Sequence, residues 1–184
     1  MPFRHWITLA LSLCLVVGSQ PVVQPAAAIG SLATSGTVGW QEDQVFTSSD
    51  PYSGLDMVID NLGGRHVLLL DKTTDVLKYA YSERGGSDWS VVTIAEGGFT
   101  EVALTLAFDG SPKIAFTRFP DLFYATRRPN GTFQVETVSR GLAIGGLSLA
   151  WSETGPQIVY GDERNRINYA HTDGAGWILD TIPL

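Results

Sequence analysis

The sequence predicts an all-β protein built from a repeated four-stranded antiparallel unit. A Tyr-Ala pair recurs every 45 residues, at Tyr79, Tyr124 and Tyr169. An aromatic residue follows each pair with a spacing of 44 residues, at Trp89, Phe133 and Trp177. Large apolar residues alternate with small or polar ones between these markers, which is the period of a strand and not of a helix. Repeats of about 40 to 50 residues made of short strands are typical of β-propeller blades.

The first strand of each unit is predicted from large apolar residues at every second position. These are Leu55, Met57 and Ile59, then Leu104, Leu106 and Phe108, then Leu147, Leu149 and Trp151. The short apolar runs HVLLL, KIAF and QIVY form the second strand of each unit. The Tyr-Ala pair lies on the third strand, and the fourth strand begins at the following aromatic residue.

Turn sequences separate these strands. NLGGR, DGSP and ETGP join first to second strands, and RGGSD, RPNG and DGAG join third to fourth strands. Gly, Asn and Asp supply the positive backbone angles of tight hairpins. We therefore predict a β-propeller-like array with a period of about 44–45 residues and full blades at residues 55–94, 102–138 and 147–182.

The repeated aromatic residues are expected to hold blades together and not to stack on a ligand. In a propeller each sheet packs face to face against the next, so a large ring on the third strand fills the space between them. The alanines that follow the tyrosines, Ala80, Ala125 and Ala170, are small because their face meets the neighbouring blade closely.

A further half blade is predicted at residues 32–46, LATSGTVGWQEDQVF, because Ala33 to Trp40 repeats the spacing of Ala170 to Trp177. Three and a half blades leave sheet edges unpaired, and such edges favour association. We expect two chains to complete a ring as a closed two-fold homodimer. The alternative is a shortened propeller that folds as an open arc.

The first 28 residues read as a secretory signal peptide. Arg4 and His5 form a basic start, residues 6–17 are apolar, and residues 26–28 are a small-residue cleavage site. The apolar run is shorter than the roughly 20 residues that a membrane span needs. We expect a propeller domain at residues 29–184 that is secreted, periplasmic or extracellular, with no membrane attachment after cleavage. Cleavage near Ser19 and lipid anchoring at Cys14 are the alternatives.

Composition excludes several classes of function. The chain has 12 basic and 19 acidic residues, a formal net charge of −7, and no basic cluster, so nucleic acid is not expected as a partner. Cys14 is the only cysteine and lies in the predicted leader, which excludes disulfides and a thiol nucleophile from the rest of the chain. No segment has the ligand spacing of a zinc site or a calcium loop, so neither a metal nor a cofactor is expected.

The segment DGSPKIAFTRFPDLFYATRRPNGTFQVETV resembles a repeat of secreted bacterial β-propeller proteins, in which Gly-x-Pro-x-Ile-Ala-Tyr, Leu-x-Tyr-Ala and Gly-x-Trp strands follow one another. The resemblance covers residues 55–182 and implies the same fold and an extracellular address. TDGAGW, residues 172–177, is also similar to the Asp-box of sialidase-like propellers, although its glycine spacing differs. That likeness implies a turn that stabilises the fold.

Candidate ligand-binding residues lie in the loops from second to third strands and from each blade to the next, which share one rim of a propeller. Aromatic and charged side chains in these loops are the candidates: Tyr52, Phe99, Glu101, Arg118, Phe119, Arg140, Asp162 and Arg164. No catalytic residue is assigned. His66 and His171 each stand isolated at a strand end, so no Ser-His-Asp arrangement is predicted from them.

Two classes of function fit these observations. The first is a secreted, non-catalytic, lectin-like binding module whose ligand is a carbohydrate or a protein. The second is a sialidase-like glycoside hydrolase, or a shortened remnant of one, which would need two carboxylates across the sugar. Several acidic residues could supply such a pair: Asp71, Asp75, Glu96, Glu101 and Asp162. A purely structural chain is the third alternative.

The leader generates the first testable prediction. Expressed with its own N-terminus in a bacterial host, the protein should be recovered outside the cytoplasm with Ile29 near its new N-terminus. N-terminal sequencing of the exported protein checks this. An exported, folded chain that still begins with Met1 would contradict the signal-peptide interpretation.

Overall fold

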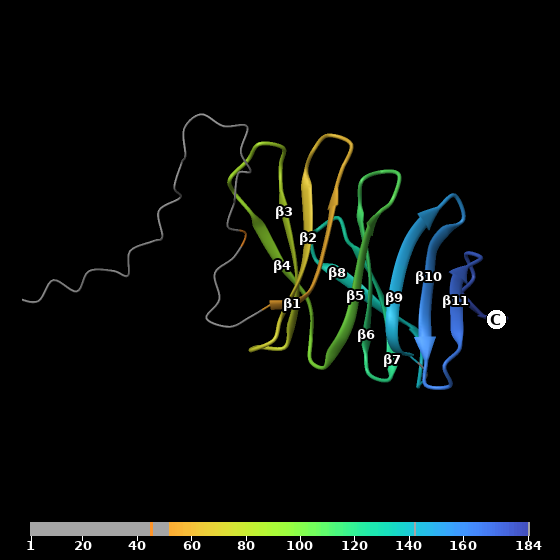
Figure 1. Ribbon diagram of the computed structural model, residues 1–184. Helices are drawn as coiled ribbons and strands as arrows, with labels where there is room; N and C mark the ends of the chain where they lie inside the picture. Colours follow the sequence, from red (N-terminus) through yellow and green to blue (C-terminus); the bar gives the residue numbers. More distant parts are fainter. Residues whose placement is uncertain (1–44, 46–51, 142, 184) are drawn as a thin grey trace, which may run out of the picture. The chain divides into compact units, whose positions relative to one another are not determined.

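The computed structural model describes residue 45, residues 52–141 and residues 143–183 (Figure 1). All of them belong to the second of two structural units, Asp43–Leu184. The signal peptide predicted at residues 1–28 lies outside the described residues. So does the half blade predicted at residues 32–46, except for Val45.

Twelve strands form three four-stranded antiparallel sheets in the part of the chain that the structure describes. Sheet 1 has the order β1 (Tyr52–Ile59), β2 (Arg65–Asp71), β3 (Val76–Ser82) and β4 (Ser90–Glu96). Sheet 2 has the order β5 (Phe99–Leu106), β6 (Pro112–Arg118), β7 (Asp121–Arg127) and β8 (Phe133–Ser139). Sheet 3 has the order β9 (Ala143–Ser152), β10 (Gly155–Asp162), β11 (Ile167–Thr172) and β12 (Trp177–Ile182).

The predicted all-β class and the three four-stranded sheets are confirmed. No helix occurs among the described residues, and so none there is long and apolar enough to cross a membrane. Each sheet is a simple meander in which consecutive strands pair, as the short predicted turns require. Figure 1 shows the β1–β2, β3–β4, β5–β6 and β9–β10 turns at one end of the sheets, which we call the hairpin end. The connections from β2 to β3, from β4 to β5 and from β6 to β7 lie at the other end, the connection end.

The strand register shows which positions are equivalent in the three sheets. Met57 pairs with Val67, Leu104 with Ile114, and Leu149 with Ile158. The prediction that Phe108 continues the first strand of sheet 2 is wrong. β5 ends at Leu106, and Phe108 lies in the turn with 75% of its surface exposed. The hairpin closes early because the Ala107 and Ser111 backbones hydrogen-bond at 2.9 Å.

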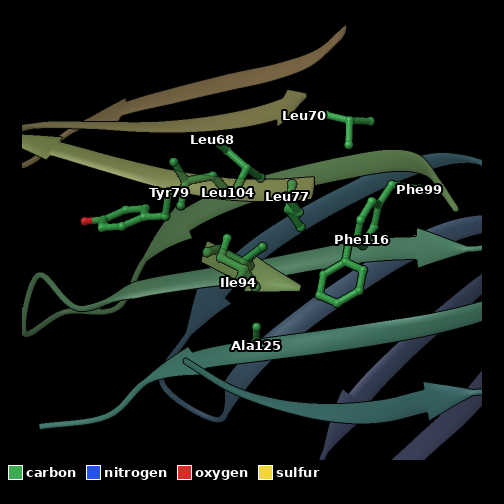
Figure 2. Packing of buried hydrophobic residues seen from close by; sticks show 10 residues of the cluster. Leu68, Leu70, Leu77, Tyr79, Ile94, Phe99, Leu104, Phe116 and Ala125 are labelled. Atoms are coloured by element: carbon green, nitrogen blue, oxygen red, sulfur yellow. The ribbon is translucent and has the colours of Figure 1, made fainter. Parts of the chain in front are cut away.

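Sheets 1 and 2 are held together by a continuous apolar core (Figure 2). Sheet 1 contributes Leu68, Leu70, Leu77, Tyr79 and Ile94, and sheet 2 contributes Phe99, Leu104, Ile114, Phe116 and Ala125. An edge-to-face ring contact between Tyr79 and Phe133 joins the two sheets, with the centroids 5.4 Å apart. Phe99 and Phe116 make a similar contact within sheet 2, also at 5.4 Å.

Sheets 2 and 3 meet through an equivalent core. Tyr124, Leu122 and Val138 of sheet 2 pack with Ile158 and Tyr160 of sheet 3. Ala125 and Ala170 are fully buried in the two cores, as their small size predicted. The ring of Tyr124 lies edge to face against Trp177 with a centroid separation of 5.3 Å. The structure thus confirms that the first two repeated tyrosines join sheets, whereas Tyr169 is only half-buried.

The first strand of each following sheet lies against the first two strands of the sheet before it. β5 contacts β1 and β2, and β9 contacts β5 and β6. A hydrogen bond crosses the first of these junctions, from the Leu104 N–H to the Asp56 carboxylate at 2.7 Å. On the face of sheet 1 turned away from sheet 2, Val45 packs with Val67, Leu69 and Ala80.

The two buried tyrosines generate a matched stability prediction. Tyr124→Ala should lower the free energy of unfolding by about 3–5 kcal/mol, because it removes a large buried ring. The two tyrosines differ in the hydrogen bonding of their hydroxyl groups. Tyr124 Oη has no hydrogen-bond partner among the described residues, whereas Tyr79 Oη lies 2.6 Å from His66 Nδ1. Tyr79→Phe should cost about 1 kcal/mol and Tyr124→Phe close to nothing.

Urea unfolding monitored by tryptophan fluorescence measures all three variants. Equal losses for the two Tyr→Phe variants would show that the His66 contact contributes nothing to stability. A larger loss for Tyr124→Phe than for Tyr79→Phe would contradict the hydrogen-bond assignment.

Candidate functional site

The residues predicted to bind a ligand lie at the connection end, but their environments differ. Tyr52 begins β1, where its backbone pairs with Asp71. Phe99 is buried in the core between sheets 1 and 2, with its ring against Phe116. Glu101 is half-buried on β5, and its backbone N–H donates to Thr117 Oγ1 at 3.0 Å.

Arg118 and Phe119 are adjacent in the chain and both exposed. They stand at the β6–β7 turn, where Arg118 is opposite Phe99 in the β-sheet register. Arg118 Nη1 donates to the Glu96 carbonyl at 3.1 Å, and its guanidinium lies 5.2 Å from the centre of the Phe123 ring. The structure therefore brings Phe99, Arg118 and Phe119 together, with only the last two exposed.

Asp162 is buried and stabilises the turn between β10 and β11. Its carboxylate accepts hydrogen bonds from Arg166 Nη2 at 2.6 Å and Nε at 2.8 Å, and from the Arg164 and Arg166 backbone N–H groups. The Arg166 guanidinium holds the pKa of Asp162 well below its usual range, against the opposing effect of burial. Arg164 and Arg140 are exposed in separate connections.

Carboxylates also tie the connection end together. Asp75 accepts a hydrogen bond from the Gly98 N–H, and Asp121 accepts one from the Gly141 N–H at 2.8 Å. Each bond joins a turn within a sheet to the connection that leaves it. Asp71 pairs with Lys78 at 3.1 Å, and this contact, with Thr74, lowers the pKa of Asp71 to about 2. Most acidic side chains here thus have structural partners.

The larger of the two described cavities is at the hairpin end. It has a volume of about 660 Å³ and lies between the turns of sheet 1 and those of sheet 2. Its lining is Asp60, Asn61, Leu62, His66, Tyr81, Asp109, Gly110, Ser111, Pro112, Arg127, Arg128, Pro129 and Gly131. None of the eight residues predicted from the sequence belongs to it.

His66 is a buried residue of the cavity lining, and the expectation that it stands isolated is wrong. Its Nδ1 lies 2.6 Å from Tyr79 Oη, its Nε2 lies 3.3 Å from Asp60 Oδ2, and its ring packs against Tyr81 at 4.9 Å. Burial raises the pKa of the Tyr79 hydroxyl, which therefore keeps its proton. We assign Tyr79 as donor to Nδ1 and Nε2–H as donor to Asp60.

Asp60 closes the β1–β2 turn from inside the cavity. Its Oδ1 accepts the Gly64 N–H at 2.7 Å and the Leu62 N–H at 2.8 Å. The Gly64 N–H is the largest cause of the lowered pKa of Asp60. Burial opposes this effect, and the hydrogen bond with His66 lowers the pKa further. Gly64 is required because a Cβ there would stand 2.4 Å from Asp60 Oδ2 and 3.0 Å from the Tyr81 ring.

The facing wall carries positive charge. The Arg127 guanidinium lies 5.7 Å from the centre of the Tyr79 ring, and its Nε donates to the Gly131 carbonyl at 3.4 Å. Arg128 is exposed, and its Nε donates to Gln134 Oε1 at 3.4 Å. In the β5–β6 turn of the same sheet, Asp109 accepts the Ser111 N–H at 2.9 Å, and Ser111 lowers the pKa of Asp109.

This arrangement suits binding of a polar ligand better than proton transfer. Ionised carboxylates accept hydrogen bonds, guanidinium groups donate them, and the Tyr81 ring offers an apolar surface. The pKa values of Asp60 and Asp109 are both lowered, so neither carboxyl holds a proton to donate at neutral pH. Among the described residues, no three His, Cys, Asp or Glu side chains are placed to hold a metal ion.

A second groove of about 350 Å³ adjoins this cavity. It shares Asp60, Asn61, Asp109 and Gly110 with the cavity and continues along apolar side chains. Those apolar residues are Val58, Ile59, Leu106, Ala107 and Phe108. Phe108, which the sequence analysis assigned to a strand, thus lines this groove.

Sequence reasoning missed the cavity because its residues come from three separate hairpin turns. Asp60, Asp109 and Arg128 each fit an ordinary solvated turn, and nothing in their local sequence sets them apart. The available signal was His66, a titratable residue within an apolar strand, six positions after Asp60. Its neighbours Tyr79 and Tyr81 come from another strand through the register.

Comparisons with known proteins assign no family to this chain. No protein-family model matches it, and no curated protein matches it significantly. The functional interpretation therefore depends on the residues of the cavity and on the repeat.

The lowered pKa of Asp60 generates a pH prediction. Because its folded pKa lies below the usual value of about 4, ionised Asp60 stabilises the fold above that pH, and this contribution is lost as pH falls through the folded pKa. Asp60→Asn should therefore be less stable than the unmodified chain at pH 7, and the difference should shrink on acidification. Urea unfolding at pH 7 and at stepwise lower pH measures it.

The matched control is Asp88→Asn, an exposed aspartate between β3 and β4. It should change stability little at either pH. A deficit of Asp60→Asn that stays constant or grows with acidification would contradict the ionised turn.

Proposed function

We propose that this protein is a secreted, non-catalytic β-propeller-like binding module that takes a carbohydrate in the cavity between sheets 1 and 2. The observation that carries the proposal is the cavity lining. It combines ionised carboxylates, guanidinium groups and a half-buried tyrosine ring in a space of about 660 Å³. Sugars present hydroxyls that both donate and accept hydrogen bonds, and apolar ring faces that pack on aromatic side chains.

The two walls of the cavity match such a ligand. Asp60 and Asp109 supply acceptors, and Arg127 and Arg128 supply donors. Each carboxylate is held by backbone N–H groups of its own turn, so the acceptors are preorganised. The adjoining groove, with Ile59 and Phe108, extends the surface for a longer saccharide or for the protein chain that carries it.

The blade arrangement belongs to the same proposal. Each sheet is a four-stranded meander, and first strands follow one another in the order β1, β5, β9 as in a propeller. Val45 adds support for the half blade. It lies five residues after Trp40, as Ile94 follows Trp89 and Val138 follows Phe133. Ile94 and Val138 pack at junctions between sheets, and Val45 packs on the free face of sheet 1.

Binding is favoured over glycoside hydrolysis by the state of the carboxyls. A glycosidase needs one carboxylic acid with a raised pKa to protonate the leaving oxygen. The two carboxyls in the cavity have lowered pKa values instead, because backbone and side-chain donors stabilise their charge. The glycosidase and its shortened remnant stay the alternative interpretation.

A glycan array followed by calorimetry with the free sugar tests the proposal. Saturable binding is expected, with no release from a panel of fluorogenic glycosides. Arg128→Ala and Asn61→Ala change exposed side chains of the cavity and should each weaken binding about tenfold, as expected for a lost hydrogen bond to a charged or polar group.

Arg140→Ala and Arg118→Ala are the controls, since both remove an exposed arginine at the connection end. They should leave binding unchanged. Loss of binding in these variants alone would move the site to the rim that the sequence predicted. Turnover of any glycoside, or no binding across the array, would overturn the proposed function.

A further inference from the structure

The outer face of sheet 3, defined by Val159, Ile167, Tyr169, Ile178 and Ile182, is built like a junction between sheets. The register places Tyr169 opposite Val159 and Ile167 opposite Ile182, all on the side turned away from sheet 2. For Val159, Ile167, Tyr169 and Ile182, the equivalent residues of sheet 1 are Leu68, Leu77, Tyr79 and Ile94, which are buried against sheet 2. Those of sheet 2 are Ala115, Leu122, Tyr124 and Val138, which are buried against sheet 3.

On sheet 3 these positions keep their apolar character without such burial. No sheet packs on this face within the described residues, and Ile178 and Ile182 are 37% and 38% exposed. Beside the apolar residues, His171 Nε2 lies 3.4 Å from the Asp180 carboxylate on the same side. An exposed apolar face of this kind favours a protein contact.

The complementary half of a junction is exposed on sheet 1. Leu55, Met57 and Ile59 form one side of β1, which we call the β1 strip, and they are 63%, 57% and 59% exposed. Their equivalents on the other first strands are covered by the preceding sheet. Leu104, which corresponds to Met57, is only 5% exposed, and Leu149 packs in the core between sheets 2 and 3.

Both internal junctions show how these halves fit. The first strand of the following sheet lies on the first two strands of the preceding one, as β5 lies on β1 and β2, and β9 on β5 and β6. On the outer face of sheet 3, a first strand placed in the same way would lie across β9 and β10, where it meets Val159. Val45 packs near β2 and β3 of sheet 1, on Val67, Leu69 and Ala80, and leaves the β1 strip exposed.

We propose that a second copy of this chain supplies that strand: the β1 strip of each protomer packs on the outer face of sheet 3 of its partner. The two contacts are identical, and together they close a two-fold dimer without a free end. The β1 strip corresponds to the first strands that pack at the two internal junctions, and the outer face of sheet 3 corresponds to the faces of sheets 1 and 2 on which those strands pack. Neither half of this contact lines the cavity of about 660 Å³, so the dimer does not depend on a carbohydrate bound there. Ile59 of the β1 strip also lines the adjoining groove, whereas Met57 lines neither space.

Light scattering coupled to size-exclusion chromatography tests this on the full chain, expressed with its own leader and purified. The expected mass is that of two chains at micromolar concentration. Met57→Glu on the β1 strip and Val159→Glu on sheet 3 should each convert the dimer to a monomer, since each places an unpaired charge in the contact. The association should weaken by more than about tenfold. Circular dichroism shows whether each variant stays folded.

Mixing the two variants distinguishes this arrangement from other dimers. Met57→Glu retains an intact sheet 3 face, and Val159→Glu retains an intact β1 strip, so one of the two contacts re-forms and a mixed dimer reappears. Two β1 strips in contact, or two sheet 3 faces in contact, would not be restored in this way. Val135→Glu, on the exposed fourth strand of sheet 2, is the matched control and should leave the dimer unchanged.

A chain that remains monomeric at every micromolar concentration would overturn the proposal. So would a dimer that resists both Met57→Glu and Val159→Glu, or one that does not return when the folded variants are mixed.

Discussion

The packing of one four-stranded sheet on the next is the constraint on which the rest of this structure depends. A single sheet of this size cannot bury both of its faces, so each sheet is stable only through its neighbours. Tyr79 and Tyr124 fill the two internal junctions, and the aromatic residues Phe133 and Trp177 of the following sheets meet their rings edge to face. The residues that repeat along the sequence are therefore those that pack one sheet on the next.

The cavity is a consequence of the same packing. Where sheets 1 and 2 are in contact along their strands, Leu68 and Phe116 are buried in an apolar core, but the hairpin turns beyond the strand ends contribute mainly polar residues. Polar turn residues therefore line the space between them. His66 marks the boundary, because its ring is buried beside Tyr79 while its Nε2 reaches Asp60 in the turn. A buried polar network of this kind is stable only when its donors and acceptors are matched.

Carboxylates have two distinct tasks in the chain. At the connection end, Asp75, Asp121 and Asp162 accept hydrogen bonds from nearby backbone groups and hold turns and connections in place. At the hairpin end, Asp60 and Asp109 also close turns, yet they face a cavity that a ligand can enter. The lowered pKa that stabilises each turn also keeps these groups as hydrogen-bond acceptors, which links fold stability to the proposed binding.

The sequence by itself determined the all-β class, the three four-stranded sheets and the junction role of Tyr79 and Tyr124, because alternation and turn chemistry are local and repeat with a constant period. Phe108 shows the limit of that logic, since its alternation continued into a turn that the Ala107–Ser111 backbone bonds had already closed. Only the tertiary structure decided the position of the cavity. Asp60 and His66 belong to the β1–β2 hairpin, Asp109 to β5–β6 and Arg128 to β7–β8. The proximity of these three hairpins depends on strand register and sheet stacking, which local sequence does not encode.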